Sequence, residues 1–511
     1  MAQLIAYDFP ASNLADFLKI ERLPLIADRD PFRQLEYIRG YVEELGCSAM
    51  LVESGYIDRD YMQDHSAFYA SSFANYGFKC RRIHFFVGIK KAELVDRLIA
   101  VNAAMGKDRE AYAAACQNFS SQHYQGFTVI KPLPGSPVGR TILRTYPAGG
   151  KDHLRQFDAI RDYWVHLLGV ELTVRGLGFQ QQDQGVSACA TTAIWSSLQK
   201  LRDFEDVASA TPAQITANAS RFALPFGRSL PSEGLSVDQM CQGVHALGIA
   251  PNLVRVESFA HARSMIFAAA RSGIAPILII RSERNSRHAV AAAGVKLSKK
   301  HTVTIVAGAN GIDDMSGDLL GVYIHDDRLG PYVRTEFAER DIKFAGEQDS
   351  QKLPCLIITE GKTPIPWAIT HLLMPVHAKI RTGVAQMLRF ATKFARFAYA
   401  YFPVLGVPKT TVQISTKIIR AHHYVEDLLV DVNAVGPART KEFFGKVELS
   451  RYVGVTTLTH PEGGVYDVLV DSTGTERNSH CLAVVCRGKP TAKSADFVKA
   501  FGRYFKCPAV V

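Results

Sequence analysis

Cys189 lies within a stretch of sequence, residues 179–195, whose pattern predicts a reactive thiol. Four glutamines and an aspartate precede it in this stretch, which reads FQQQDQGVSACATTAIW, and no Gly or Pro follows until Pro212. Apolar residues then recur at three- and four-residue spacing, which predicts a helix that begins at or just before the cysteine. Unpaired N–H groups and the positive end of the helix dipole gather at a helix start, and both favour a thiolate. We therefore expect Cys189 to be a nucleophile, with an upstream glutamine that donates an N–H to an oxyanion.

A cysteine nucleophile needs a base that shares its proton and an acceptor that orients this base. His288 opens the apolar run HAVAAAGV, and Asp326 and Asp327 follow a second run, GVYIH. Both runs are typical of strands. Neighbouring strand residues point to opposite faces, so only one aspartate would face the histidine; we choose Asp326 and keep Asp327 as the alternate. The order along the chain predicts a triad of Cys189, His288 and Asp326.

Each of these residues also has an ordinary structural interpretation. Free cysteines are among the most buried residues, and a histidine beside Arg287 fits a solvated strand end. An aspartate pair close to Gly-Pro is most often a turn former. The joint occurrence of the three residue types in this order is what favours a catalytic site.

With these residues the central third of the chain resembles the papain-like cysteine peptidases, and among them the bacterial double-glycine peptidases. The matching pieces are QDQG at 182–185 ahead of Cys189, the strand that opens at His288, and Asp326 after the next long strand. The resemblance implies a cysteine at the head of a helix in one lobe. It places histidine and aspartate on a second lobe, with catalysis in the cleft between the two.

The resemblance also implies that a glutamine side chain and the cysteine's own backbone N–H bind the oxyanion. The position where the family usually carries this glutamine holds Asp183 in this chain. We favour Gln182 for the role and keep Gln184 as the alternate. The expected activity is that of a cysteine peptidase, which cleaves a peptide or isopeptide bond in a protein or peptide substrate. Acyl transfer to an amine and deamidation of glutamine would use the same groups.

No cofactor and no metal ion are expected for this activity. The chain has 16 histidines, but none shows the HExxH spacing of a metal hydrolase. Its nine cysteines form no CxxC pair, so neither a zinc ribbon nor a disulfide scaffold is indicated.

The length of 511 residues predicts roughly three domains. We expect an α+β protein with an N-terminal mixed α/β domain over 1–165, a papain-like domain over 166–345 and a C-terminal α+β domain over 346–511. A helix is expected at 154–168. Helical patterns then occupy the first half of the central domain and strand patterns the second half, which predicts a helical lobe and an antiparallel β lobe.

The net charge of +10 is concentrated in residues 361–425, which hold nine Lys or Arg and no Asp or Glu. Part of this segment, 382–402, is expected to be a helix in which basic and aromatic residues alternate. Such a pattern fits nucleic acid, or an acidic partner, at residues 379–420. It also fits an amphipathic helix that buries its aromatic rings. A non-catalytic regulatory module, binding nucleic acid or protein on a papain-like scaffold, is therefore a second hypothesis.

Targeting signals are not evident in the sequence. The first residues carry Asp8 and no basic segment ahead of an apolar run, unlike a signal peptide. The longest apolar stretch, 390–407, is interrupted by Lys393, Arg396 and Pro403, so no membrane span is predicted. We expect a cytoplasmic protein with reduced thiols.

Overall fold

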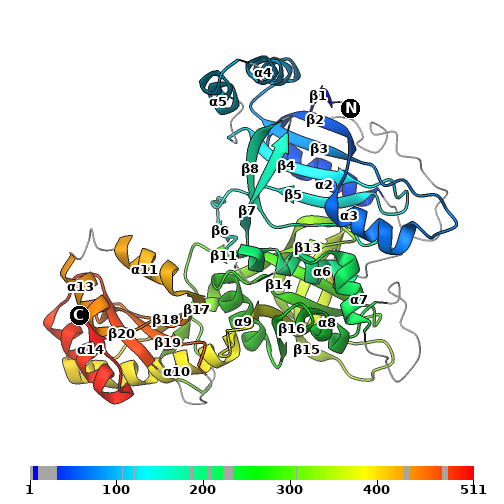
Figure 1. Cartoon of the computed structure of the whole chain (residues 1–511). Coiled ribbons are helices and arrows are strands. Elements are labelled where there is room, and N and C mark those ends of the chain that lie inside the picture. Colours follow the sequence, from blue (N-terminus) through cyan, green and yellow to red (C-terminus); the bar gives the residue numbers. More distant parts are fainter. Residues whose placement is uncertain are drawn as a thin grey trace.

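The computed structural model of the chain contains three main β-sheets with helices packed against them (Figure 1). They form an N-terminal unit, a central barrel and a C-terminal unit. Every helix and strand below belongs to the described part of the chain, namely residues 4–9, 32–105, 107–118, 122–167, 169–183, 189–203, 207, 209–221, 234–306, 308–430, 437–474 and 481–511.

The N-terminal unit is a five-stranded antiparallel sheet with a buried layer on each face. Its strands follow chain order: β1 (Leu4–Asp8), β2 (Cys47–Tyr56), β3 (Cys80–Val87), β4 (Tyr124–Ile130) and β5 (Val138–Leu143). One face packs on α2 (Arg33–Glu44), and the other on α4 (Lys91–Ala104) and the hairpin of β7 (Arg161–Leu167) and β8 (Val170–Gly176). Short helices complete it: α3 (Arg59–Asp64), η1 (His65–Tyr69) and α5 (Arg109–Asn118). Burial on both faces explains why these strands read as continuous apolar runs.

The central unit is a closed antiparallel barrel. Its strand order is β10 (Ile277–Ser282), β11 (Arg287–Ser298), β13 (Leu319–Asp326), β14 (Gly330–Ile342), β15 (Gln351–Glu360) and β16 (Thr363–His377). β10 pairs with β16 as well as with β11, and this second pairing closes the ring. Two further strands extend it, β9 (Ile249–Arg255) on β16 and β6 (His153–Gln156) on β11.

A helical layer covers one face of the barrel beside β10 and β11. It consists of α6 (Cys189–Leu198), α7 (Pro212–Ala219) and α8 (Val237–His245). Alternate residues of β10 face different cores, because Ile277 and Ile279 pack toward these helices while Leu278 and Ile280 face the opposite way. Local chemistry sets two of the helix starts, since Thr211 and Ser236 each form a capping box with a glutamine three residues later.

The C-terminal unit is a six-stranded sheet covered by helices. Its order is β12 (Ile312–Asp314), β17 (Val412–Arg420), β18 (Tyr452–His460), β19 (Gly464–Asp471), β20 (Cys481–Arg487) and β21 (Ala509–Val510). Its helices are α10 (Val384–Tyr401), η5 (Phe402–Leu405), α11 (Ala421–Val430), α13 (Pro437–Lys446) and α14 (Ala492–Phe505). β12 comes from the connection between β11 and β13 and pairs in parallel with β17. The sheet is therefore joined directly to the barrel, and α9 (Phe259–Arg271) packs between them.

The overall α+β class agrees with the sequence, but the domain limits differ. The limit expected at 345 falls between β14 and β15, which are paired neighbours in one barrel, so the central unit continues to His377. The limit at 165 falls inside β7. The helix expected at 154–168 is wrong, because this segment forms β6 and β7. In β7 the inward and outward residues alternate, and this period of two identifies a strand.

Gly126 offers a test of the N-terminal sheet. Its φ is +117°, and a Cβ there would lie 2.0 Å from the carbonyl oxygen of Ile142 on the paired strand. Gly126→Ala should therefore lower the free energy of unfolding by about 2 kcal/mol or more, as measured by urea denaturation. Gly40 lies in α2 with open space around its Cα, so Gly40→Ala is the matched control and should raise stability by up to about 1 kcal/mol. Equal effects of the two substitutions would contradict the register of β4 and β5.

Candidate functional site

Cys189 is the first residue of α6 within the described part of the chain. Thr192 donates its Oγ1 hydrogen to the carbonyl of Cys189 at 2.9 Å, which fixes the first turn. The nine helix residues after the cysteine are all buried, whereas Cys189 itself is half-buried at the margin of the core beneath α6–α8. Among the described residues, no hydrogen bond joins its Sγ to His288. The structure therefore puts the thiol at a helix start, partly open to solvent.

His288 and the two aspartates come together at one end of the barrel. His288 opens β11, and its Nε2 lies 3.0 Å from Asp326 Oδ1 and 3.6 Å from Asp327 Oδ1. All three side chains are buried. Both carboxylates approach the ring because Asp326 ends β13 and Asp327 already belongs to the turn, where strand alternation no longer applies. Of the two aspartates, Asp326 forms the hydrogen bond with His288.

Arg328 completes this group and was missed in the sequence. Its Nη2 lies 3.0 Å from Asp326 Oδ2 and its Nε 3.2 Å from Oδ1, and its backbone N–H also donates to Asp326 Oδ1. The guanidinium stacks 4.8 Å from the ring centre of Trp367, which lies 6.0 Å from the His288 ring. An arginine two residues after a candidate catalytic aspartate was the available signal.

The charges of this group are set by mutual contact. Burial opposes the charged form of His288, but the negative charge of Asp326 outweighs it and raises the pKa of His288 to about 10. Burial also acts to raise the pKa of Asp326, yet His288 and Arg328 together hold it well below its usual range. Burial raises the pKa of Asp327 to about 6. At neutral pH the group thus contains an imidazolium next to an ionised Asp326.

The same three side chains have the donor types of a metal site. One atom from each of His288, Asp326 and Asp327 lies within 4.8 Å of the others. However, Arg328 contacts both oxygens of Asp326, so a cation there would meet a guanidinium at close range. The arrangement favours an ion-paired imidazolium over a metal centre.

The polar residues ahead of Cys189 lie in different environments. Gln181 accepts the N–H of Val138 on β5, so the segment is tied to the N-terminal sheet. Gln182 is half-buried. Asp183 is buried with Lys131, with 3.4 Å between Nζ and Oδ2, and therefore has a structural partner. Gln184, the alternate oxyanion donor, lies outside the described residues. Gln180, which the sequence did not single out, is buried with no hydrogen bond to its Nε2 from the described residues.

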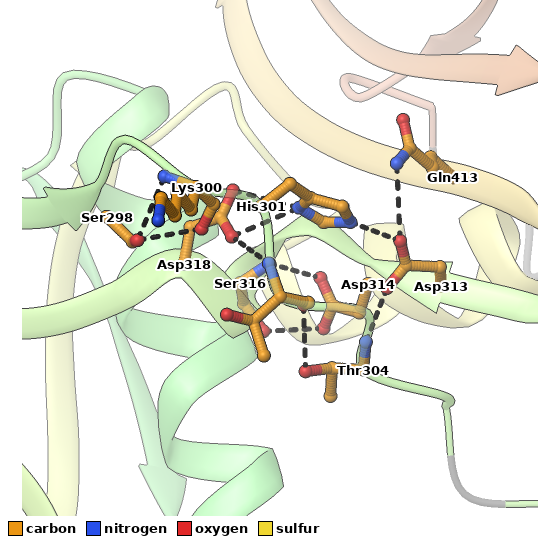
Figure 2. A network of polar contacts seen from close by, with 10 residues as sticks. Ser298, Lys300, His301, Thr304, Asp313, Asp314, Ser316, Asp318 and Gln413 are labelled. Atoms are coloured by element: carbon orange, nitrogen blue, oxygen red, sulfur yellow. Dashed lines mark hydrogen bonds and ion pairs between the residues drawn. The ribbon is translucent and has the colours of Figure 1, made fainter. Parts of the chain in front are cut away.

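A second histidine–carboxylate cluster lies between the barrel and the C-terminal sheet (Figure 2). His301 Nε2 contacts Asp313 Oδ2 at 2.5 Å, and its Nδ1 contacts Asp318 at 3.0 Å. Asp313 also accepts the N–H of Thr304 and the side-chain amide of Gln413 on β17. Both ring nitrogens are occupied by carboxylates, so His301 has no free nitrogen with which to act as a base. The cluster instead fastens the β11–β13 connection to β17.

The basic, aromatic segment forms α10, as expected for 382–402. Its aromatic rings pack on α14, with Phe394 5.0 Å from Phe505 and Phe397 5.3 Å from Phe501 between ring centres. Three basic side chains of α10 are exposed, and one of them, Lys393, lies 5.6 Å from the ring centre of Phe505. They are Arg389, Lys393 and Arg396. The rings are thus engaged with one another, and the exposed feature is a row of positive charge. Within the described residues, no helix is both long and apolar enough to cross a lipid bilayer.

Comparison with models of known protein families and with curated proteins gave no match to this chain. The functional interpretation therefore rests on the residues and their geometry.

The charge state of His288 leads to a prediction about pH. Its pKa is raised on folding, so its contribution to stability is complete below its unfolded value of about 6.5 and is lost as the pH rises through about 10. Between pH 7 and 10 the free energy of unfolding of the wild type should fall by at least about 2 kcal/mol more than that of His288→Gln. Urea denaturation across this range measures the difference. His166→Gln, at an exposed position on β7, is the control and should follow the wild type.

Proposed function

We propose that this chain is a papain-like thiol hydrolase that cleaves a peptide or isopeptide bond. The observation that carries the proposal is the buried ion pair of His288 and Asp326 at the end of a barrel on which α6 packs, with Cys189 as the first described residue of α6. A buried imidazolium held by a carboxylate, beside a helix that starts with a thiol, fits nucleophilic catalysis by cysteine.

The direction in which α6 runs along β11 supports the pairing of Cys189 with His288. In the last turn of α6, the Ser197 hydroxyl donates a hydrogen bond to the carbonyl of Ala275. Ala275 lies just before β10, at the level of Ala292 on the paired strand β11. Cys189 lies about 12 Å away along the helix. His288 lies about 13 Å from Ala292 along the strand. A helix that runs along β11 from this anchor carries Cys189 toward His288.

The ring geometry of His288 suits a proton donor to a leaving group. Nε2 of His288 is engaged in a hydrogen bond with Asp326, so Nδ1 is the ring nitrogen that can exchange a proton with the substrate. In the proposed reaction the Cys189 thiolate attacks the carbonyl carbon, and Nδ1–H protonates the leaving nitrogen as the C–N bond breaks. Water then attacks the thioester and gives a proton to Nδ1, and the C–S bond breaks. This releases the Cys189 thiolate and the carboxylic acid, which loses its proton to water. Asp326 orients the ring and stabilises its charge.

The oxyanion formed in each addition step needs hydrogen-bond donors. The backbone N–H of Cys189 and the side-chain amide of Gln182 are the proposed donors, with Gln184 as the alternate for the amide. Both glutamines belong to the segment that leads into α6, so a change in that segment would alter the oxyanion site and the nucleophile together.

The arrangement of the central unit supports a papain-like fold for this activity. The thiol belongs to a helical layer, whereas histidine and aspartate belong to the barrel. The family is similar in distributing its catalytic groups over a helical and a β lobe. We expect a protein or peptide substrate, and action in the cytoplasm, where a catalytic thiol stays reduced. Acyl transfer to an amine and deamidation remain alternatives for the same residues, and mass analysis of the product separates them.

Labelling by a thiol-directed acyl probe tests the proposal. Peptide mapping should find the label on Cys189 in the wild type, and Cys189→Ala should lose this site while label on other thiols such as Cys507 is unchanged. His288→Ala should slow labelling about 100-fold at neutral pH, because the imidazolium no longer supports the thiolate. Cys241→Ala, at a half-buried thiol on α8, is the matched control and should label like the wild type.

Equal labelling of the wild type and Cys189→Ala would overturn the thiol-hydrolase proposal. The non-catalytic alternative, a regulatory module that binds nucleic acid or protein, would then be favoured. Its candidate surface is the basic row on α10, for which salt-dependent retention of a DNA or RNA pool is the corresponding measurement. Because the aromatic rings of α10 are packed against α14, that surface would contact phosphates rather than stack on bases.

A further inference from the structure

Cys481 and Cys507 lie against each other in the C-terminal unit, far along the chain from the proposed active site. Their Sγ atoms are 2.9 Å apart. Cys481 opens β20, and Cys507 follows α14 and leads into β21, which pairs in parallel with β20. The distance exceeds the roughly 2.05 Å of a disulfide bond by less than an ångström. A small side-chain movement would therefore join the two sulfurs.

The chain around Cys507 is folded tightly onto the end of α14. Lys506 adopts a left-handed conformation with φ +55°, and Cys507 N–H donates to the carbonyl of Gly502 at 2.9 Å. A Cβ at Gly502 would lie 2.7 Å from the carbonyl oxygen of Cys507, so this approach requires glycine. The turn holds Cys507 in place beside Cys481.

The two thiols differ in their hydrogen bonds. The S–H of Cys481 donates to Sγ of Cys507, and this bond is the main reason why the pKa of Cys481 lies above its ordinary value. Of the two, Cys507 lines a hollow on the surface and Cys481 does not, so a reagent that enters the hollow meets Cys507 first and Cys481 is placed to react second.

Cys507 is mostly buried, but it lines an open, basic hollow on the surface. The residues around this hollow are Lys499, Gly502, Arg503, Lys506, Cys507 and Ala509. Three of the six are cationic and none is acidic. Such a surface raises the local concentration of small anions around Cys507.

We propose that Cys507 and Cys481 form a redox site that reacts with anionic low-molecular-weight disulfides of the glutathione type. The Cys507 thiolate attacks one sulfur of the disulfide, whose S–S bond breaks and releases one thiolate, leaving a mixed disulfide on Cys507. Cys481 loses its proton, attacks Sγ of Cys507 and releases the second thiolate. The two protein thiols are oxidised to one disulfide by two electrons, and the small disulfide is reduced to two thiols.

The protein disulfide would connect the start of β20 to the end of α14. It would hold α14 and β21 against the sheet, and it would reopen when reduced thiols are in excess. The site depends on neither Cys189 nor His288, so it stands or falls separately from the proposed hydrolase.

Thiol counting and peptide mapping on the full chain, treated with glutathione disulfide, test the site. The wild type should lose two thiols and yield a Cys481–Cys507 linked peptide. Cys481→Ser should stop at a glutathione adduct on Cys507, because the second thiol is missing, and Cys507→Ser should react at least about 10-fold more slowly. Cys486→Ser, at a buried position on β20, is the control and should behave like the wild type. Linkage of other cysteines, or equal thiol loss in Cys507→Ser and the wild type, would overturn the proposal.

The charge of the hollow is tested by the choice of disulfide. Lys499→Glu combined with Arg503→Glu should slow the reaction with glutathione disulfide by about 10-fold and speed the reaction with cystamine, a cationic disulfide. Both side chains lie on the exposed side of α14, so the fold should be retained, as checked by the thermal midpoint. Equal slowing with both disulfides would show that the hollow does not select anionic reagents.

Discussion

The central unit depends on β10, the strand that hydrogen-bonds to a neighbour on each side and thereby closes the barrel. Its pairing with β11 sets His288 opposite Ile280. The residues just before β10 also receive the hydrogen bond from Ser197 that anchors α6. One strand therefore fixes the start of β11 and the position of the helix that carries Cys189. A shift of β10 by one residue would exchange its two apolar faces and separate the helical layer from the barrel.

The barrel end at His288 holds more buried charge than stability alone explains. Charges removed from water cost free energy that an ion pair recovers only with good geometry and further hydrogen bonds. Asp326 has both, because it accepts from His288, from the guanidinium of Arg328 and from the Arg328 backbone N–H. Apolar residues of similar size would fill the same space with less penalty. The charges of His288 and Asp326 are therefore kept in the barrel by their mutual contacts and by Arg328.

Local signals in the sequence predicted the helices of the central unit but were misleading for residues 154–168, which form strands. Ser236 begins a capping box that lies within four residues, His288 begins an apolar run and Asp326 follows one. The closure of β10 on β16 had no such signal, because it joins strands about ninety residues apart. The limit expected at 345 failed for that reason. The contact of Arg328 with Asp326 required the turn geometry, which residue spacing alone does not provide.

The cysteines show where reasoning from spacing ends. The absence of any CxxC pair argued for independent, reduced thiols, and this argument considers only neighbours along the chain. Cys481 and Cys507 are 26 residues apart and meet because α14 returns the chain to β20, where β21 adds as a parallel strand. A parallel pairing always requires such a return. The same element that completes the sheet therefore creates the thiol pair, so a pair of this kind follows from topology and is invisible to motif spacing.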